Sequence, residues 1–364
     1  MKIRARHNSN GIALIMALIA IFVLSALAAG FALSMKVETR LAQNADSEQQ
    51  LLWLGRSGVE LARYVLSQQL TIPNEPYDSL NQIWAGGPGG PDATNSALSG
   101  LSLDHYPVGD GTVSIKIIDL ERKVNINTAV NPANSQMVIQ ALTIMGVDAG
   151  DISVVSDSIM DWIDADDLPR PAGAESDYYQ GLTVPYYAKN APIDDLSELL
   201  LIKGITPEMY WGSNATNHTP SVFQHKLGLG TSPGQTPDYP FGLVDIFTPI
   251  SSGRINVNTA DLNVLQMIPG VDQTAAENII KFRSGPDGLE GTDDDTPFRV
   301  PGDLSQVDSA LNAQQLNALC TTRSSTFEVH VTAQIGDYRR EYVAILYRNP
   351  TNGTDVQVLG FYWK

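Results

Sequence analysis

The chain has 364 residues, enough for two or more domains with their own cores, and it carries 40 acidic against 23 basic residues, a net charge of −17. Such an acidic surface disfavours binding to nucleic acid and to anionic lipid. The single cysteine, Cys320, excludes an internal disulfide and a thiolate zinc cluster. Because Cys320 ends the apolar helical pattern AQQLNALC, we expect a buried thiol in a helix there.

The N-terminal segment combines a basic head with an apolar run. Three basic residues precede Gly11, and no charged residue occurs in the 24 positions from Ile12 to Met35. A helix of that length spans a bilayer core. The basic head favours a cytoplasmic N-terminus and an exported remainder.

Three interpretations of this segment compete: an uncut signal anchor, a secretory signal cut after the ALA at Ala26–Ala28, and a segment cut just after Gly11 and retained. Residues 35–70 contain no proline, and their apolar positions recur at helical spacing. One helix is therefore expected from about Ile12 to Leu70. Cleavage inside it would discard half of that helix, so helix continuity favours a retained segment.

A short basic leader ending in glycine before such a helix resembles the N-terminus of type IV pilins and type II secretion pseudopilins. The resemblance implies that prepilin peptidase cleaves between Gly11 and Ile12 and that the new N-terminus at Ile12 is methylated. Those families usually have glutamate as the fifth mature residue, where this chain has Met16. A carboxylate in lipid is costly unless it is paired. The apolar Met16 therefore favours a subunit at the filament tip, with nothing beyond it, over a shaft subunit.

Strand patterns flank a long helical and loop-rich stretch. The segment 111–127 alternates apolar and polar residues, and 325–335, 340–349 and 356–364 are strand candidates separated by turn residues. A long helix with antiparallel strands predicts an α+β, type IV pilin-like fold with a large inserted α-helical domain. The predicted domains are the leader 1–11, the transmembrane part 12–35, the pilin-like part 36–123, the inserted α-domain 124–322 and the C-terminal strands 323–364.

An internal repeat marks the insertion. KVNINTA at 123–129 and RINVNTA at 254–260 are near copies, and the IPGV at 268–271, between two helical patterns, resembles a helix-hairpin-helix unit, as found in SAM-like domains. That unit often binds DNA through backbone amides and basic residues. Here the turn carries Asp272 and an acidic stretch follows, so the electrostatic term opposes DNA binding. A helix-packing role is favoured.

The glycine-rich loop 284–298 offers several carboxylates at short intervals. Calcium binds six to eight oxygens on flexible loops of this kind, although the spacing is not that of an EF-hand. The alternative is a solvated acidic loop. We expect calcium here, with these predicted ligands, the second through its backbone carbonyl: Asp287, Leu289, Glu290, Asp293 and Asp295.

A second acidic block, DWIDADDLPRPAGAESDYYQ, gathers carboxylates around one arginine. Paired carboxylates occur in general acid–base catalysis and in glycoside hydrolysis, but no nucleophile or nearby histidine accompanies them. The block is interpreted as either an ion-pair network or a second metal site. Its members are Asp161, Asp164, Asp166, Asp167, Arg170, Glu175 and Asp177.

The leader, the VNINTA motif, the aspartate-rich block and the late INVNTA…IPGV unit occur together in this order. In this combination the chain is similar to the general secretion pathway protein K family, the large minor pseudopilins of type II secretion systems, over essentially its whole length. The resemblance implies bound calcium and a complex with the minor pseudopilins I and J, and with H as a further candidate, on a filament of major pseudopilin.

The resulting hypothesis is a non-enzymatic assembly protein, anchored by one helix in the bacterial inner membrane with its other domains in the periplasm. It would cap the periplasmic pseudopilus and help to initiate its assembly. The alternatives are a tip pilin of a type IV pilus, a periplasmic helix-hairpin-helix protein for DNA uptake, and a carboxylate-dependent hydrolase built on residues 161–177.

Overall fold

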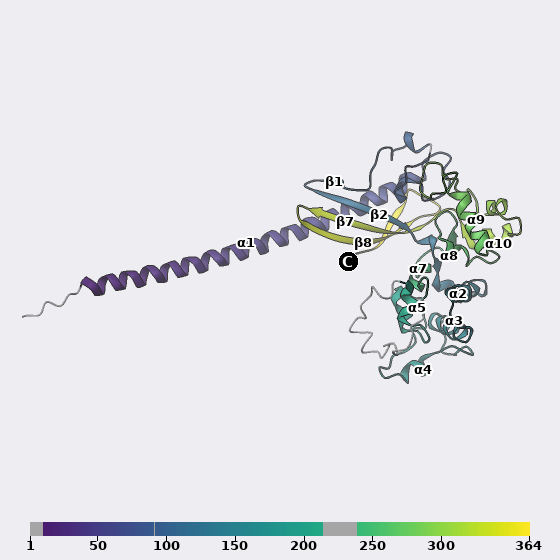
Figure 1. Cartoon of the computed structure of the whole chain (residues 1–364), viewed down its shortest axis with the longest axis horizontal. Helices are drawn as coiled ribbons and strands as arrows, with labels where there is room; N and C mark the ends of the chain where they lie inside the picture. The colour runs from purple at the N-terminus through teal and green to yellow at the C-terminus, as the bar shows by residue number, and fades with distance from the viewer. Residues whose placement is uncertain (1–9, 91, 214–238) are drawn as a thin grey trace, which may run out of the picture.

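One long helix, α1 (Asn10–Gln69), projects from a globular body (Figure 1). The computed structural model describes residues 10–90, 92–213 and 239–364. Because no proline interrupts residues 10–69, the helix continues from the apolar segment onto the body, which confirms the single helix predicted from the sequence. Most of the predicted leader, residues 1–9, lies outside the described residues.

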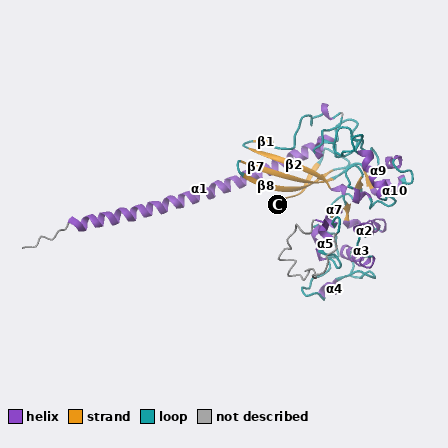
Figure 2. Ribbon diagram, in the orientation of Figure 1, coloured by secondary structure: helices purple, strands orange, loops and turns teal. Residues whose placement is uncertain are grey.

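A five-stranded antiparallel sheet packs on the C-terminal half of α1 (Figure 2). The strand order is β1-β2-β7-β8-β9, so β2 lies beside β7, with Ile117 opposite Val329, although the whole insertion separates them in sequence. The predicted strands and their shared sheet are thereby confirmed. The bounds are β1 Tyr106–Val108, β2 Gly111–Asp119, β7 Thr326–Ile335, β8 Tyr338–Arg348 and β9 Val356–Trp363.

Two glycines let α1 lie close to the sheet. A Cβ atom added at Gly55 would lie 2.4 Å from the ring of Tyr342, and one added at Gly58 would lie 2.4 Å from a methyl group of Val331. Larger residues would push the helix off the strands and open the core beneath it. That core contains Val65 and Leu66 of α1 and the inward-facing residues of β2, β7 and β8.

The inserted domain has a second, separate hydrophobic core. Its α-helices are short and connected by loops and 3₁₀ turns, and they lie beyond the end of the sheet and below it in Figure 1. The helices are α2 Pro132–Met145, α3 Ala149–Ile163, α4 Ser176–Gln180, α5 Pro207–Trp211, α7 Leu243–Ile246, α8 Leu262–Leu265, α9 Gln273–Arg283 and α10 Ala313–Leu319. The 3₁₀ segments near the sheet and the core are η3 Leu120–Arg122, η4 Ile126–Thr128, η5 Leu196–Leu201 and η7 Pro301–Gln306.

The repeated VNINTA and INVNTA motifs have equivalent structural roles. Each opens with a two-residue strand that pairs in parallel with a later one: β3 (Val124–Asn125) with β4 (Phe247–Thr248), and β5 (Ile255–Asn256) with β6 (Cys320–Thr321).

Each motif also holds a distant backbone segment through an asparagine amide. Asn127 bonds the N–H and the carbonyl of Ile193 at 2.7 and 2.9 Å, and Asn258 bonds those of Phe298 at 2.8 and 2.9 Å. The sequence repeat therefore corresponds to two similarly closed units.

One local prediction needs correction. Cys320 is buried, as expected, but it begins β6 and is not part of a helix. Helix α10 ends at Leu319 because the chain then extends to pair with Ile255. The predicted domain boundaries stay predictions, and part of the predicted domain 124–322, residues 214–238, lies outside the described residues.

Candidate processing and cation sites

The predicted processing site lies at the free end of α1. The peptide bond between Gly11 and Ile12 belongs to the first turn of the helix. From Ala13 onward the helix is long and apolar enough to cross a membrane, and its most apolar window is not buried in the body. The side chain of Met16 is 66% exposed. Cleavage, methylation and the tip-specific role of Met16 stay predictions.

The aspartate-rich block folds back on the end of α3. Arg170 donates from Nη1 to Oδ1 of Asp161 at 2.6 Å and also contacts Asp164. The N–H of Arg170 bonds the carboxylate of Asp161 as well, at 3.1 Å. Asp161 is fully buried. The ion-pair network is therefore present, and it uses two of the carboxylates in the block.

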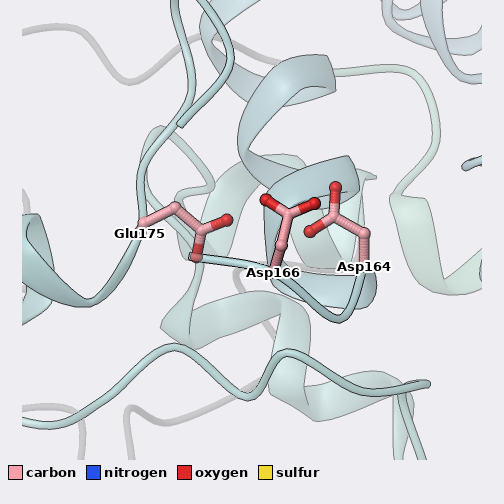
Figure 3. Close-up of side chains that lie close together, drawn as sticks. All are labelled: Asp164, Asp166 and Glu175. Atoms are coloured by element: carbon pink, nitrogen blue, oxygen red, sulfur yellow. The ribbon is translucent and has the colours of Figure 1, made fainter. Parts of the chain in front are cut away.

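Three carboxylates of the block converge beside this ion pair. Oxygen atoms of Asp164, Asp166 and Glu175 all lie within 4.8 Å of one another, and the three side chains turn toward a common point (Figure 3). Glu175 is only 3% exposed, and neither of its carboxylate oxygens has a hydrogen-bond partner among the described residues. One oxygen of Asp164 is likewise buried without a partner. A buried carboxylate without donors is unfavourable.

The electrostatics of this cluster favour a positive ligand. Burial, reinforced by the charges of Asp161, Asp164 and the neighbouring aspartates, raises the pKa of Glu175 to about 7. Burial also raises the pKa of Asp161, against the opposing effect of its bonds to Arg170. The cluster must either hold a proton on Glu175 or bind a cation there.

The donor set fits a hard cation such as calcium, which prefers carboxylate and amide oxygens. The sequence analysis missed one neighbour, Asn190. Its amide donates to the carbonyl of Asp166 at 2.7 Å, and its own side-chain oxygen is buried without a partner. No pattern in the sequence singles out Asn190; in the structure it has a positive φ of 48°, which asparagine tolerates better than most residues.

The two remaining aspartates of the block have other roles. Asp167 accepts a hydrogen bond from the N–H of Ser176 at 3.2 Å, at the start of α4, and the side chain of Ser176 together with this N–H lowers the pKa of Asp167. Asp177 is exposed in the first turn of the same helix. Neither belongs to the group of converging oxygens.

The predicted calcium loop after α9 is arranged differently. Glu290 is ion-paired with the buried Arg283 at 2.5 Å. Asp287 accepts from the N–H of Leu289 at 2.7 Å, and Asp295 accepts from the N–H of Gly291 at 2.8 Å.

The loop nevertheless brings all five predicted residues onto one curled segment, with positive φ at its three glycines, Gly285, Gly288 and Gly291. Asp293 is exposed, and Leu289 is 63% exposed. Among the described residues, however, the compact group of carboxylate oxygens lies in the aspartate-rich block and not here. Calcium binding by the loop stays a prediction.

Comparison with known proteins gives consistent matches. Residues 118–212 match the family model for type II secretion system protein K, and residues 251–288 match a helix-hairpin-helix motif. A type II secretion system protein K from Pseudomonas aeruginosa is 26% identical over 94% of this chain and 90% of its own length. The protein of that name from Aeromonas hydrophila is 24% identical over 95% of each.

The fold has a solved counterpart. A chain in the crystal structure of the GspK–GspI–GspJ complex from enterotoxigenic Escherichia coli superimposes with a TM-score of 0.60 and 19% identity, covering 89% of this chain and 99% of that one. This confirms the predicted fold class, a long N-terminal helix and antiparallel sheet with added helical units. The family model over residues 118–212 and the relatives that cover nearly the whole chain together support assignment to the type II secretion system protein K family.

Proposed function

We propose that this chain is the minor pseudopilin that caps the tip of the periplasmic pseudopilus and helps to initiate its assembly. The observation that carries the proposal is the shape of the molecule. The apolar part of α1 extends freely from one end, and the inserted domain lies beyond the far end of the sheet and below it (Figure 1).

The position of the inserted domain favours the tip over the shaft. In a filament whose α1 helices run along the axis, each shaft subunit has other subunits stacked above it. The insertion occupies the side where the next subunit would stack. A terminal subunit has no such neighbour, and an apolar Met16 needs no partner for a buried charge.

The partners follow from the same arrangement. The solved relative was crystallised as a complex with GspI and GspJ. For this chain we propose minor pseudopilins of those two types, which pack laterally along α1, with prepilin peptidase acting at Gly11 and the inner membrane around residues 12–35. Every residue from 13 to 46 of α1 is exposed, so this surface is available to partner subunits.

The other candidate functions are less well supported. The full-length relatives are secretion-system proteins, which does not favour a type IV pilus. The helix-hairpin-helix turn carries Asp272, whose carboxylate caps α9 by accepting from the N–H of Ala275 at 2.8 Å, and the net charge of −17 opposes DNA uptake. Arg170 neutralises part of the acidic block. A scaffold role thus accounts for the block without catalysis.

Immunogold labelling of assembled pseudopili tests the tip position. We expect the label for this chain at one end of each filament and expect deletion of the chain to reduce filament initiation and secretion together. Met16→Leu serves as the matched control, because it keeps the position apolar. Met16→Glu is expected to reduce assembly, since the new carboxylate has no partner at the tip. Label along the whole shaft would refute the proposal.

We also propose that calcium binds the cluster of Asp164, Asp166 and Glu175, and that the loop 284–298 is a second calcium site. The support for the first site is the set of buried, unpartnered oxygens. A ligand that binds only the folded state at 100 times its dissociation constant stabilises by about 2.7 kcal/mol. Calcium should therefore raise the melting temperature of the full chain in detergent after chelator treatment.

Variants show which of the two sites causes the calcium-dependent rise in melting temperature. Glu175→Gln should reduce the rise, whereas Asp177→Asn, an exposed residue of the same block, should not. The double variant Asp293→Ala and Asp295→Ala reports on the loop in the same way. If neither Glu175→Gln nor the loop variant reduces the rise, both sites are refuted.

A further inference from the structure

A cavity of about 370 Å³ opens where α1, the sheet and the inserted domain meet. Its wall includes the residue after α1, the end of β8 and the segments beside β5 and β6. The polar residues of this wall that could contact a ligand include Arg254, Arg323, Arg348, Ser252 and Asn349. Among the residues that the structure describes, no aspartate or glutamate lines this cavity, although acidic residues outnumber basic ones in the chain as a whole.

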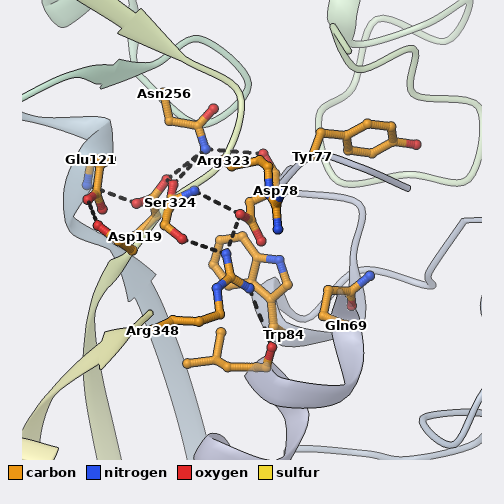
Figure 4. Close-up of polar contacts among 12 residues, drawn as sticks. Gln69, Tyr77, Asp78, Trp84, Asp119, Glu121, Asn256, Arg323, Ser324 and Arg348 are labelled. Atoms are coloured by element: carbon orange, nitrogen blue, oxygen red, sulfur yellow. Dashed lines mark hydrogen bonds and ion pairs between the residues drawn. The ribbon is translucent and has the colours of Figure 1, made fainter. Parts of the chain in front are cut away.

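Two of the three arginines have no counter-charge. Among the described residues, no carboxylate lies within 4 Å of the guanidinium groups of Arg254 and Arg323, and neither group donates a hydrogen bond. Arg348 is different, because its guanidinium contacts Asp78 and donates to the carbonyl of Ser324 at 2.5 Å (Figure 4). The cavity therefore presents two unpaired positive charges.

The carboxylates behind the wall are already engaged. Glu121 is fully buried, and its two oxygens accept from the N–H of Ser252 at 3.1 Å, from the hydroxyl of Ser325 at 2.7 Å and from the N–H of Thr326 at 3.0 Å. The Oδ2 of Asp119 bonds Ser324 Oγ at 2.7 Å and Asn256 Nδ2 at 3.0 Å (Figure 4). These bonds fix the backbone of the wall, and Arg254 and Arg323 line the cavity as exposed residues on that wall.

We propose that Arg254 and Arg323 form a binding site for one compact oxyanion, a phosphate or a carboxylate group. A guanidinium group pairs with both through two parallel hydrogen bonds. Two like charges that share a small cavity repel each other, and a bound anion removes that repulsion. The net charge of −17 carried by the chain opposes a polyanion such as DNA, so the proposed ligand is a small ion or a single acidic group.

The location gives this ligand a structural effect. Leu70 follows α1, Pro350 follows β8, and Arg254 and Arg323 flank the paired strands β5 and β6 of the inserted domain. An anion held there lies where the pilin-like part and the insertion meet. This inference rests on the cavity alone and does not depend on the proposed role at the filament tip.

Calorimetric titration of the full chain in detergent tests the site at constant ionic strength. Inorganic phosphate, succinate and chloride are titrated separately, in the presence of chelator so that calcium phosphate cannot form. We expect saturable binding of phosphate, of succinate or of both, and none of chloride. Binding of phosphate alone indicates a phosphate-like ligand, and binding of succinate indicates that an acidic group of a protein or metabolite also fits.

The double variant Arg254→Gln and Arg323→Gln should weaken this binding at least about tenfold, since it removes the charge-assisted hydrogen bonds of both guanidinium groups to the anion. Only backbone atoms of Arg323 make hydrogen bonds, so the variant is expected to fold. Arg339→Gln, at the other end of β8, removes one positive charge outside the cavity and is the control. Absence of phosphate and succinate binding, or equal binding by the double variant, overturns the proposal.

Discussion

Arg170 and Asp161 form the ion pair on which the aspartate-rich block is built. Nη1 of Arg170 lies 2.6 Å from Oδ1 of Asp161, and the N–H of the same arginine bonds that carboxylate too. Because Asp161 has no exposed surface, this double attachment holds the loop after α3 against the helix. The loop then places Asp164 and Asp166 beside Glu175, and the carboxylates that Arg170 does not neutralise remain available to a cation.

The pH dependence of stability should report on Glu175. Its pKa is about 7 in the folded chain and about 4.5 in the unfolded chain, so the folded state binds more protons between these values. In chelator, the free energy of unfolding should therefore fall as the pH rises from about 4.5 to 7, by at most about 3 kcal/mol from this group. Denaturant unfolding at several pH values measures this change in the free energy of unfolding.

Glu175→Gln should flatten this dependence. Burial raises the pKa of Asp119 to about 8, so this residue also makes stability fall with rising pH. Wild type and Glu175→Gln share that contribution. The difference between the two curves therefore isolates Glu175. Saturating calcium should flatten the wild-type curve between about pH 4.5 and 7, because the cation takes the place of the proton on Glu175. Parallel curves for wild type and variant in chelator would show that Glu175 titrates normally.

Gly173→Ala should destabilise the same block. A Cβ atom at this position would lie 1.9 Å from Oδ2 of Asp161, which Arg170 prevents from moving. We expect a loss of about 1–3 kcal/mol, as for other overpacked sites, and weaker calcium stabilisation. Gly150→Ala on α3 is the matched control, since a Cβ atom there meets nothing within 4 Å. Equal melting temperatures for the two variants would contradict this account.

Asp78→Asn should be among the most damaging single changes. It leaves Arg348, which is 2% exposed, without its counter-charge between α1 and the sheet. Breaking a buried ion pair from one side costs about 3–5 kcal/mol. Urea unfolding measures the loss, with Asp337→Asn in the exposed β7–β8 turn as the control. Adding Arg348→Met should recover part of the stability, and no recovery would indicate that the hydrogen bonds of Arg348 to backbone carbonyls dominate.

Mass spectrometry of the mature N-terminus tests the processing site. The protein isolated from cells should begin at methylated Ile12, and Gly11→Leu should leave the leader attached. Gly30→Ala lies in the same helix and should be processed normally, because a Cβ atom there has no neighbour within 4 Å. A mature chain that begins at Ala29 would instead identify a secretory signal.

The sequence by itself determined the elements whose signals are local. The absence of proline and the apolar run specify α1, and the alternation Val113, Ile115, Ile117 specifies β2, because each pattern follows the period of one element. The repeated Asn-Thr-Ala motif likewise indicated two related units. In the structure, Asn127 of the first motif bonds Ile193, and Asn258 of the second bonds Phe298.

Only the tertiary structure decided which charged residues meet. Both acidic segments had enough carboxylates for a cation, but in the loop after α9 the buried Arg283 pairs with Glu290, whereas in the earlier block Glu175 is left buried without a partner. Arg254 and Arg323 are 69 positions apart in the sequence and share a cavity only because β5 pairs with β6. Such sites depend on contacts between residues far apart in the sequence and on which polar groups become buried. Local sequence patterns indicate neither of these.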